Sequence, residues 1–131
     1  MATPVQVEIV AVDREVWSGE VEMVLARTVE GEIGVLHGHV PLLGALAEGG
    51  IVRLVAEDGS ETRVAVHGGF LSVTEDGVQI LAELAELESE IDVERAQQQL
   101  AAAQAQADDD EEAQAALLRA TARLRAAGQS V

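Results

Sequence analysis

The sequence contains no cysteine, no lysine and no tyrosine, and it has only one tryptophan and one phenylalanine. Without cysteine, the chain can form neither a disulfide nor a thiolate metal site, and it has no thiol nucleophile. Because aromatic residues make up only 2% of the chain, a hydrophobic core must come from aliphatic side chains and alanine, and the apolar fraction of 48% is ample for one. The 131 residues suffice for one ordinary domain, or for a small domain with an appendage.

Positive charge is equally scarce. All eight basic residues are arginine, against 24 acidic residues, so the formal net charge is −16. This balance argues against binding to nucleic acid or to anionic lipid, because both need a basic surface, and it favours solubility or a basic protein partner. No run of 18 apolar residues is long enough to span a membrane, and we expect no signal peptide because the N-terminus lacks a basic region followed by an apolar segment.

The composition changes near residue 87. Residues 1–87 contain all but one of the 12 glycines, both prolines and all three histidines, whereas residues 88–131 consist mainly of Ala, Gln, Leu, Arg and acidic residues. We therefore predict an α+β protein with two domains, a β-rich domain at 1–87 and a helical domain at 88–131.

The first part shows strand patterns separated by turn signals. Val5–Val10 alternates apolar and polar residues, as half-buried strands do, and the Asp-Gly pairs at 58–59 and 76–77 are typical of hairpin turns. Turn signals that recur every eight to twelve residues predict an antiparallel β-sandwich or flattened barrel. The predicted strands are 5–10, 16–17, 21–28, 51–55, 62–66, 70–73 and 78–82, with Gly68-Gly69 separating two of them.

The second part has helical periodicity, with apolar residues three or four positions apart. Asp92 and Asp110 are predicted N-caps of two helices, and the acidic turn at 108–110 joins them into an αα-hairpin. Alanine buries little apolar area, so we expect the hairpin to be held weakly and to be able to detach from the sandwich. The two predicted seams are Val93, Ala96, Leu100, Ala103 and Ala107, then Ala113, Leu117, Ala120, Leu124 and Ala127.

The stretch Glu30–Leu43 combines histidines, glycines and a proline, which predicts an exposed loop that leads into a core strand. One interpretation is a turn with a structural role only. A second is metal binding, as in a small cupin-like enzyme that uses His37 and His39, although no carboxylate follows His39 within four residues. A third interpretation is recognition by a partner protein.

The pattern Glu-Gly-x-x-Gly-x-x-x-Gly-His-x-Pro-Leu-Leu over Glu30–Leu43 resembles the hallmark of the epsilon subunit of bacterial F-type, proton-translocating ATP synthases. The resemblance continues in order through Gly49-Gly50, Gly68–Leu71 and Ile91–Ala96, so it covers nearly the whole chain. His37 is a departure, because the family usually has proline there.

The resemblance implies a noncatalytic rotor subunit that requires no cofactor and no metal. Its sandwich would dock on the gamma subunit and on the membrane-embedded c-ring, with Glu32 and His39 as contacts. Its helical hairpin would be a movable arm that inhibits ATP hydrolysis by extending to the catalytic alpha and beta subunits. The protein would then be peripheral, on the cytoplasmic face of the bacterial cell membrane, and would meet the membrane only through the complex.

The resemblance also implies a regulatory nucleotide site on the hairpin. A basic residue expected in the first helix is replaced near Ala102, so we expect ATP binding to be weak or absent. The same residues have simpler interpretations, as helix caps, a surface ion pair or partners of the helix dipole. If ATP binds, three guanidinium groups could converge on its phosphates. The residues that match the motif are Ile91, Asp92, Arg95, Ala96, Arg119 and Arg123.

Overall fold

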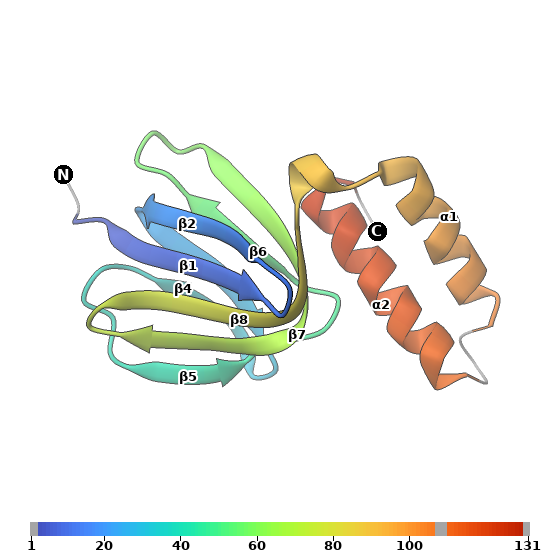
Figure 1. The fold of residues 1–131 in the computed structure, drawn as a ribbon, viewed down its shortest axis with the longest axis horizontal. Coiled ribbons are helices and arrows are strands. Elements are labelled where there is room, and N and C mark those ends of the chain that lie inside the picture. The colour runs from blue at the N-terminus through green and yellow to red at the C-terminus, as the bar shows by residue number, and fades with distance from the viewer. Residues whose placement is uncertain (1–2, 107–109, 130–131) are drawn as a thin grey trace.

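Eight strands and a helical hairpin make up the computed structural model, which describes residues 3–106 and 110–129 (Figure 1). The predicted order of a β-sandwich followed by helices is confirmed. The elements are β1 (Val5–Ala11), β2 (Glu15–Val21), β3 (Met23–Thr28), β4 (Gly31–Val35), β5 (Leu42–Ala45), β6 (Ile51–Val55), β7 (Glu61–Thr74), β8 (Gly77–Leu87), a 3-10 turn (Glu88–Glu90), α1 (Val93–Gln104) and α2 (Glu111–Ala126).

The strands follow the order β2-β1-β8-β7-β6-β3-β4, and β5 pairs with β7 outside this path. Among the described strands, β1 pairs with β8 in parallel, whereas the other recorded pairs are antiparallel. The predicted sandwich is therefore antiparallel except for the parallel pair of β1 and β8. The parallel pair joins the first and last strands of the sandwich.

β7 is one strand, although its two glycines predicted a break between two strands. Its first part pairs with β6 and its second part with β5, so the strand must bend as it passes from one layer to the other. Gly69 lies at this bend with φ 138°, and a Cβ there would collide with the backbone of β8 at Leu81. Glycine is needed here because no other residue tolerates both that conformation and that close approach.

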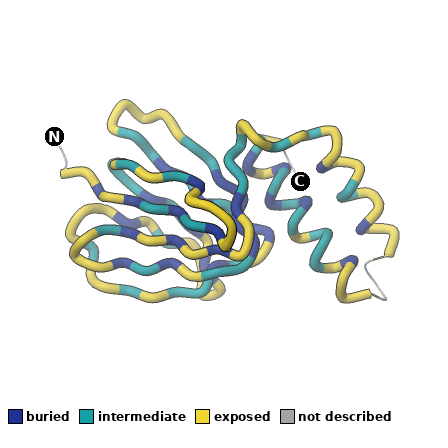
Figure 2. Tube along the Cα trace, viewed as in Figure 1, coloured by how far each residue is buried: buried dark blue, intermediate teal, exposed yellow. Residues whose placement is uncertain are grey.

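The core lies between the two layers and is aliphatic, as the composition predicted (Figure 2). β1 alternates buried and less buried residues along its whole length, which confirms the period-two pattern. Trp17 is only partly buried and packs against the core from β2. The largest fully buried side chains are Ile9, Leu54, Leu71, Ile80, Val7, Val24, Val35, Val52 and Val64.

Both predicted helix caps are present. The Asp92 carboxylate accepts a hydrogen bond from the backbone N of Arg95 at 3.1 Å, and the Asp110 carboxylate accepts one from the backbone N of Glu112 at 2.9 Å. Each bond satisfies a backbone N–H that the helix itself leaves unpaired. Of the predicted seams, Ala96, Ala103, Ala113, Ala120 and Leu124 are buried. Ala107 and the turn residues 108–109 lie outside the described residues.

α2 packs against the sandwich through a second face that the sequence analysis did not identify. Ala122 and Ala126 are fully buried against Ala65 of β7, with Ile51 and Ile91 at the margin of this small cluster. α1 lies on the far side of α2, away from the strands (Figure 1). The hairpin is therefore attached to the sandwich mainly through one helix and small side chains. Among the described helices, none is long and apolar enough to cross a membrane.

Candidate functional site

The stretch Glu30–Leu43 forms one edge of the sandwich. It contains β4, which ends the strand path, and the start of β5, which pairs only with β7 among the described strands. The predicted exposed loop is therefore partly a strand. The strand that follows contacts the core through Leu42, whereas Leu43 faces away from the core and is 72% exposed. Leu36 and Val40 are 52% and 71% exposed, so the turn between β4 and β5 carries exposed apolar side chains.

A tight turn connects β4 to β5. The backbone N of His39 donates to the Leu36 carbonyl at 3.1 Å, and Gly38 adopts φ 85°, as the third position of a type II turn requires. His37 and His39 thus lie in a turn and not on alternate positions of a strand. The Nδ1 of His39 lies 2.7 Å from the carbonyl oxygen of Val40.

No metal centre forms around these histidines in the part of the chain that the structure describes. Within residues 3–106 and 110–129, no three His, Asp or Glu side chains are grouped closely enough to hold a metal ion. The cupin-like interpretation of His37 and His39 therefore gains no support from the geometry.

Glu32 and His39 share the edge but do not touch. Glu32 lies on β4, with its side chain 57% exposed, and its Oε1 is 3.4 Å from Nη2 of Arg53 on β6. His39 lies beyond the end of β4, in the wall of a cleft that also contains Glu75 and Asp76 from the β7–β8 turn. The two residues could contact one partner along the edge, but they do not form one local site.

A second exposed apolar surface covers the outer face of β5, β7 and β8. In the register of these strands, Phe70 lies directly opposite Leu81 on one side and Ala45 on the other. Phe70 is 54% exposed and Leu81 is 47% exposed, so the only phenylalanine of the chain lies on its surface. Contiguous apolar residues on a surface typically mark a protein interface.

A carboxylate on β8 connects the sandwich to the hairpin. Oε1 of Glu86 lies 3.0 Å from Nε2 of His67 on β7 and accepts a hydrogen bond from Nε of Arg123 on α2 at 2.7 Å. Nη1 of Arg123 also donates to Oε1 of Gln99 on α1 at 3.1 Å, so the network joins both helices to the strands. We refer to His67, Glu86 and Arg123 as the clip.

Although Glu86 is partly buried, the clip stabilises its charged form. The hydrogen bond from His67 and the hydrogen bond and positive charge of Arg123 lower the pKa of Glu86 from 4.5 to about 2, against the opposing effect of burial. His67 is 7% exposed, and its Nδ1 is buried without a hydrogen-bond partner among the described residues. Of these three residues, only Arg123 was predicted from the sequence as part of a site, because residues from three elements far apart in the chain leave no local pattern.

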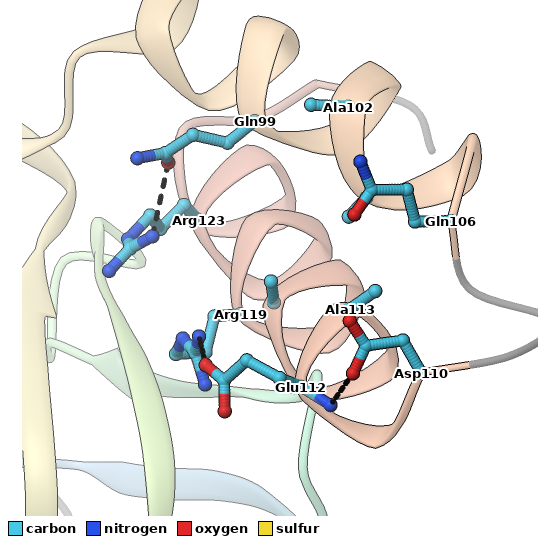
Figure 3. A pocket seen from close by; sticks show the side chains of 10 residues that line it. Gln99, Ala102, Gln106, Asp110, Glu112, Ala113, Arg119 and Arg123 are labelled. Atoms are coloured by element: carbon cyan, nitrogen blue, oxygen red, sulfur yellow. Dashed lines mark hydrogen bonds and ion pairs between the residues drawn. The ribbon is translucent and has the colours of Figure 1, made fainter.

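A groove with a volume of about 520 Å³ runs between α1 and α2 (Figure 3). Two of the six predicted nucleotide residues line it, and both are already engaged. Arg123 belongs to the clip, and Nη2 of Arg119 lies 3.2 Å from Oε1 of Glu112. The full lining is Gln99, Ala102, Ala103, Gln106, Asp110, Glu112, Ala113, Ala116, Arg119 and Arg123.

The other four predicted nucleotide residues lie outside this lining. Asp92 caps α1, Ala96 is buried, Ile91 packs beside the cluster under α2, and Arg95 is exposed. The α1 wall of the groove is uncharged, whereas Asp110 and Glu112 contribute carboxylates on the other side. The structure thus brings together Arg119 and Arg123 but not the third guanidinium group.

These observations define a docking protein, in which a β-sandwich with two exposed apolar surfaces carries a helical hairpin that is clipped to it. A family model described as the β-sandwich domain of the ATP synthase delta/epsilon chain matches residues 4–88. The chain therefore belongs to the ATP synthase delta/epsilon family.

Similar proteins agree with this assignment over the hairpin as well. The chain is 56% identical to the ATP synthase epsilon chain of Thermobifida fusca over 123 residues, which cover 92% of this chain and 90% of that protein. It is 50% identical to the epsilon chain of Mycobacterium sp. (strain KMS), with 94% of each chain covered. Its fold resembles a chain in the OSCP/F1/c-ring structure of the Euglena gracilis mitochondrial ATP synthase, with a TM-score of 0.80, 30% identity, and coverage of 96% of this chain and 82% of that chain.

Proposed function

We propose that this chain is the noncatalytic epsilon subunit of a bacterial ATP synthase, in which it forms part of the central stalk, couples the gamma subunit to the c-ring and restrains ATP hydrolysis. The observation that carries this proposal is the similarity to epsilon chains, which extends over the sandwich and the hairpin together. The resemblance to a chain from an F1/c-ring complex supports the same partners.

Two docking surfaces fit two partners. The edge built by residues 30–43 would contact the loops of the c-ring, with Glu32 and His39 as polar contacts among exposed apolar residues. The outer face around Phe70 and Leu81 would dock on gamma. Edge strands expose unpaired backbone N–H and C=O groups, which can pair with other chains and cause aggregation. A partner that covers β4 and β5 would also shield these groups.

We assign separate roles to residues 1–87 and residues 88–131, as docking domain and regulatory arm. The arm has its own helix–helix seam, and it is attached to the sandwich mainly by small alanine contacts and the clip. Such an attachment is suited to a two-state element whose states differ by only a few kcal/mol. In the released state, the hairpin would extend along gamma and contact the alpha and beta subunits.

ATP would be at most a weak regulatory ligand of the arm. The hairpin groove contains positive charge from Arg119 and Arg123. A rearrangement of α1 would be needed to bring the other four predicted residues into the groove: Ile91, Asp92, Arg95 and Ala96. The uncharged Ala102 wall and the two carboxylates of the groove disfavour phosphate binding. We place the assembled protein on the cytoplasmic face of the bacterial membrane, as a peripheral component of the complex.

Docking on the c-ring can be tested with the double variant Glu32→Gln/His39→Ala. Because it removes both polar contacts from the edge, we expect the Kd for a purified gamma–c-ring complex to rise tenfold or more, which corresponds to about 1.4 kcal/mol. Biolayer interferometry with the full-length chain measures this change.

The matched control is Glu57→Gln, which removes one charge from the exposed β6–β7 turn. It should bind like the parent chain. Equal affinities for the parent and the double variant would show that the edge does not face the c-ring, provided that both chains have the same Tm.

A further inference from the structure

Half of the arginines of this acidic chain surround one groove on the outer face of the sandwich. Arg27, Arg53 and Arg63 come from β3, β6 and β7, and Arg125 comes from the last turn of α2. We call this the arginine groove. It has a volume of about 340 Å³, and its full lining is Leu25, Ala26, Arg27, Glu32, Gly50, Ile51, Arg53, Glu61, Arg63 and Arg125. It shares no residue with the groove between the helices.

The strand register places like charges together in this groove. Arg53 lies directly opposite Arg63 in the antiparallel pair of β6 and β7. Like charges in directly opposed positions destabilise a sheet. The arrangement therefore carries a cost that a bound anion would offset.

The carboxylates of the chain compensate these guanidinium groups only in part. Glu61 lies between two of them, 3.5 Å from Nη1 of Arg53 and 3.7 Å from Nε of Arg63, and Glu32 is 3.4 Å from Arg53. Strong bonds between guanidinium and carboxylate groups are shorter, at about 2.7–2.9 Å. The pairs in the groove are therefore loose, and Glu61 is shared between two cations.

The other two arginines form no close ion pair in the described part of the chain. Nη1 of Arg125 donates to the carbonyl oxygen of Gly49 at 2.9 Å, a neutral group that holds the guanidinium in place without neutralising it. Glu32 lies directly opposite Arg27 in the pair of β3 and β4, but within residues 3–106 and 110–129 its ion pair is with Arg53 and not with Arg27. The groove thus holds four cations against two anions, although the whole chain has a net charge of −16.

We propose that the arginine groove binds a small polyphosphate anion, such as pyrophosphate or the phosphate chain of a nucleotide. The excess of two positive charges fits a polyanion, and the planar guanidinium fork is suited to bidentate contact with phosphate oxygens. A compact anion fits better than an acidic peptide, because the four cations converge on one concavity and do not form a linear track. The ligand would contact the sandwich and α2 together, and would therefore favour the docked hairpin.

Titration calorimetry of the full-length chain with pyrophosphate at low ionic strength tests the proposal. Arg53→Gln should weaken binding about tenfold or more, because a hydrogen bond to a charged group is lost. Arg14→Gln is the matched control, since it removes the same charge from a guanidinium that pairs with Glu90 outside the groove. It should leave pyrophosphate affinity within about twofold of the parent, because screening confines the effect of a distant charge.

Glu61→Gln provides an effect of opposite sign. It removes the carboxylate that competes with the ligand for Arg53 and Arg63, so we expect binding about threefold tighter or more. A damaged fold cannot produce tighter binding, so this variant keeps the test decisive.

The position of the ligand is read from backbone amide NMR shifts. With pyrophosphate and with ATP, we expect the largest changes at Gly50, Ile51 and Arg53. Three results would overturn the proposal: no binding at millimolar pyrophosphate, equal weakening by Arg53→Gln and Arg14→Gln, or shifts confined to the groove that contains Arg119 and Arg123. Shifts at the arginine groove with ATP but not with pyrophosphate would also contradict it, because phosphate recognition would then not carry the binding.

Discussion

At the scale of single residues, Glu86 determines how the hairpin is fixed to the sandwich. One carboxylate oxygen accepts from His67 on a strand and from Arg123 on a helix, and both donors lower its pKa. The buried apolar cluster under α2 consists of Ala65, Ala122 and Ala126, and alanine gains little from burial. The clip, together with the hydrogen bond from Arg125 to the carbonyl oxygen of Gly49, therefore supplies polar contacts on which we expect docking to depend.

Acid should release the hairpin before it unfolds the sandwich. The pKa of Glu86 is about 2 in the folded chain, against an ordinary value of 4.5, so its stabilising contribution is present above pH 4.5 and is lost as the pH falls toward 2. We expect amide NMR shifts of α2 to change progressively over that range while the shifts of β1 and β8 persist.

Glu86→Gln is the control for this titration. Glutamine keeps an acceptor oxygen but has no charge, so the variant should show a partly released hairpin at pH 7. It should also lose the α2 transition in acid. An α2 transition at the same pH in the parent and in Glu86→Gln would mean that another group controls docking.

At the scale of elements, the sequence correctly predicted the features that depend on local patterns of residues. The caps at Asp92 and Asp110 and the Asp-Gly turns depend on a few neighbouring residues, and the structure contains them. The single bent β7 was not predictable, because glycine pairs mark both turns and kinks. Whether a strand continues through a glycine pair depends on the neighbouring strands with which it pairs, here β5, β6 and β8.

The packing of the helices was also only partly predictable from the sequence. The spacing of alanines in α2 predicted one seam, toward α1, but the helix buries a second face at Ala122 and Ala126. Alanine is common in both buried and exposed helix positions, so its periodicity does not reveal a second packing partner. The clip and the arginine groove depend on contacts between distant elements, and for that reason they also escaped the sequence analysis.

The hairpin groove predicts a gain of ATP binding from one substitution on α1. Ala102 lines the uncharged wall of the groove opposite Arg119 and Arg123, so Ala102→Arg adds a third guanidinium there. We expect the affinity for ATP to rise about tenfold or more, as for a new hydrogen bond between charged groups. Calorimetry with ATP measures the change.

Ala102→Gln is the matched control, because it lengthens the side chain without adding charge, and it should bind ATP like the parent chain. Similar affinity in the parent, Ala102→Arg and Ala102→Gln would show that this groove does not receive the phosphates.

At the scale of the whole molecule, the proposed function gives the two ends of the chain different roles. The sandwich has an extensive aliphatic core of its own and exposes apolar side chains to which we assign docking. The hairpin lies beside it, with α2 against the strands and α1 outside (Figure 1). Rigid docking and a releasable arm can thus coexist in one small protein, because the core of the sandwich does not depend on the helices.

The most direct measurement of this account is the rate of ATP hydrolysis by the assembled ATP synthase, with either the full-length chain or residues 1–87 as its epsilon subunit. If the hairpin occupies the inhibitory state about half of the time, the truncated chain should raise hydrolysis about twofold, and more if that state dominates. The same preparations should retain gamma–c-ring binding. An unchanged rate with normal binding would contradict the central claim that the hairpin is an inhibitory arm.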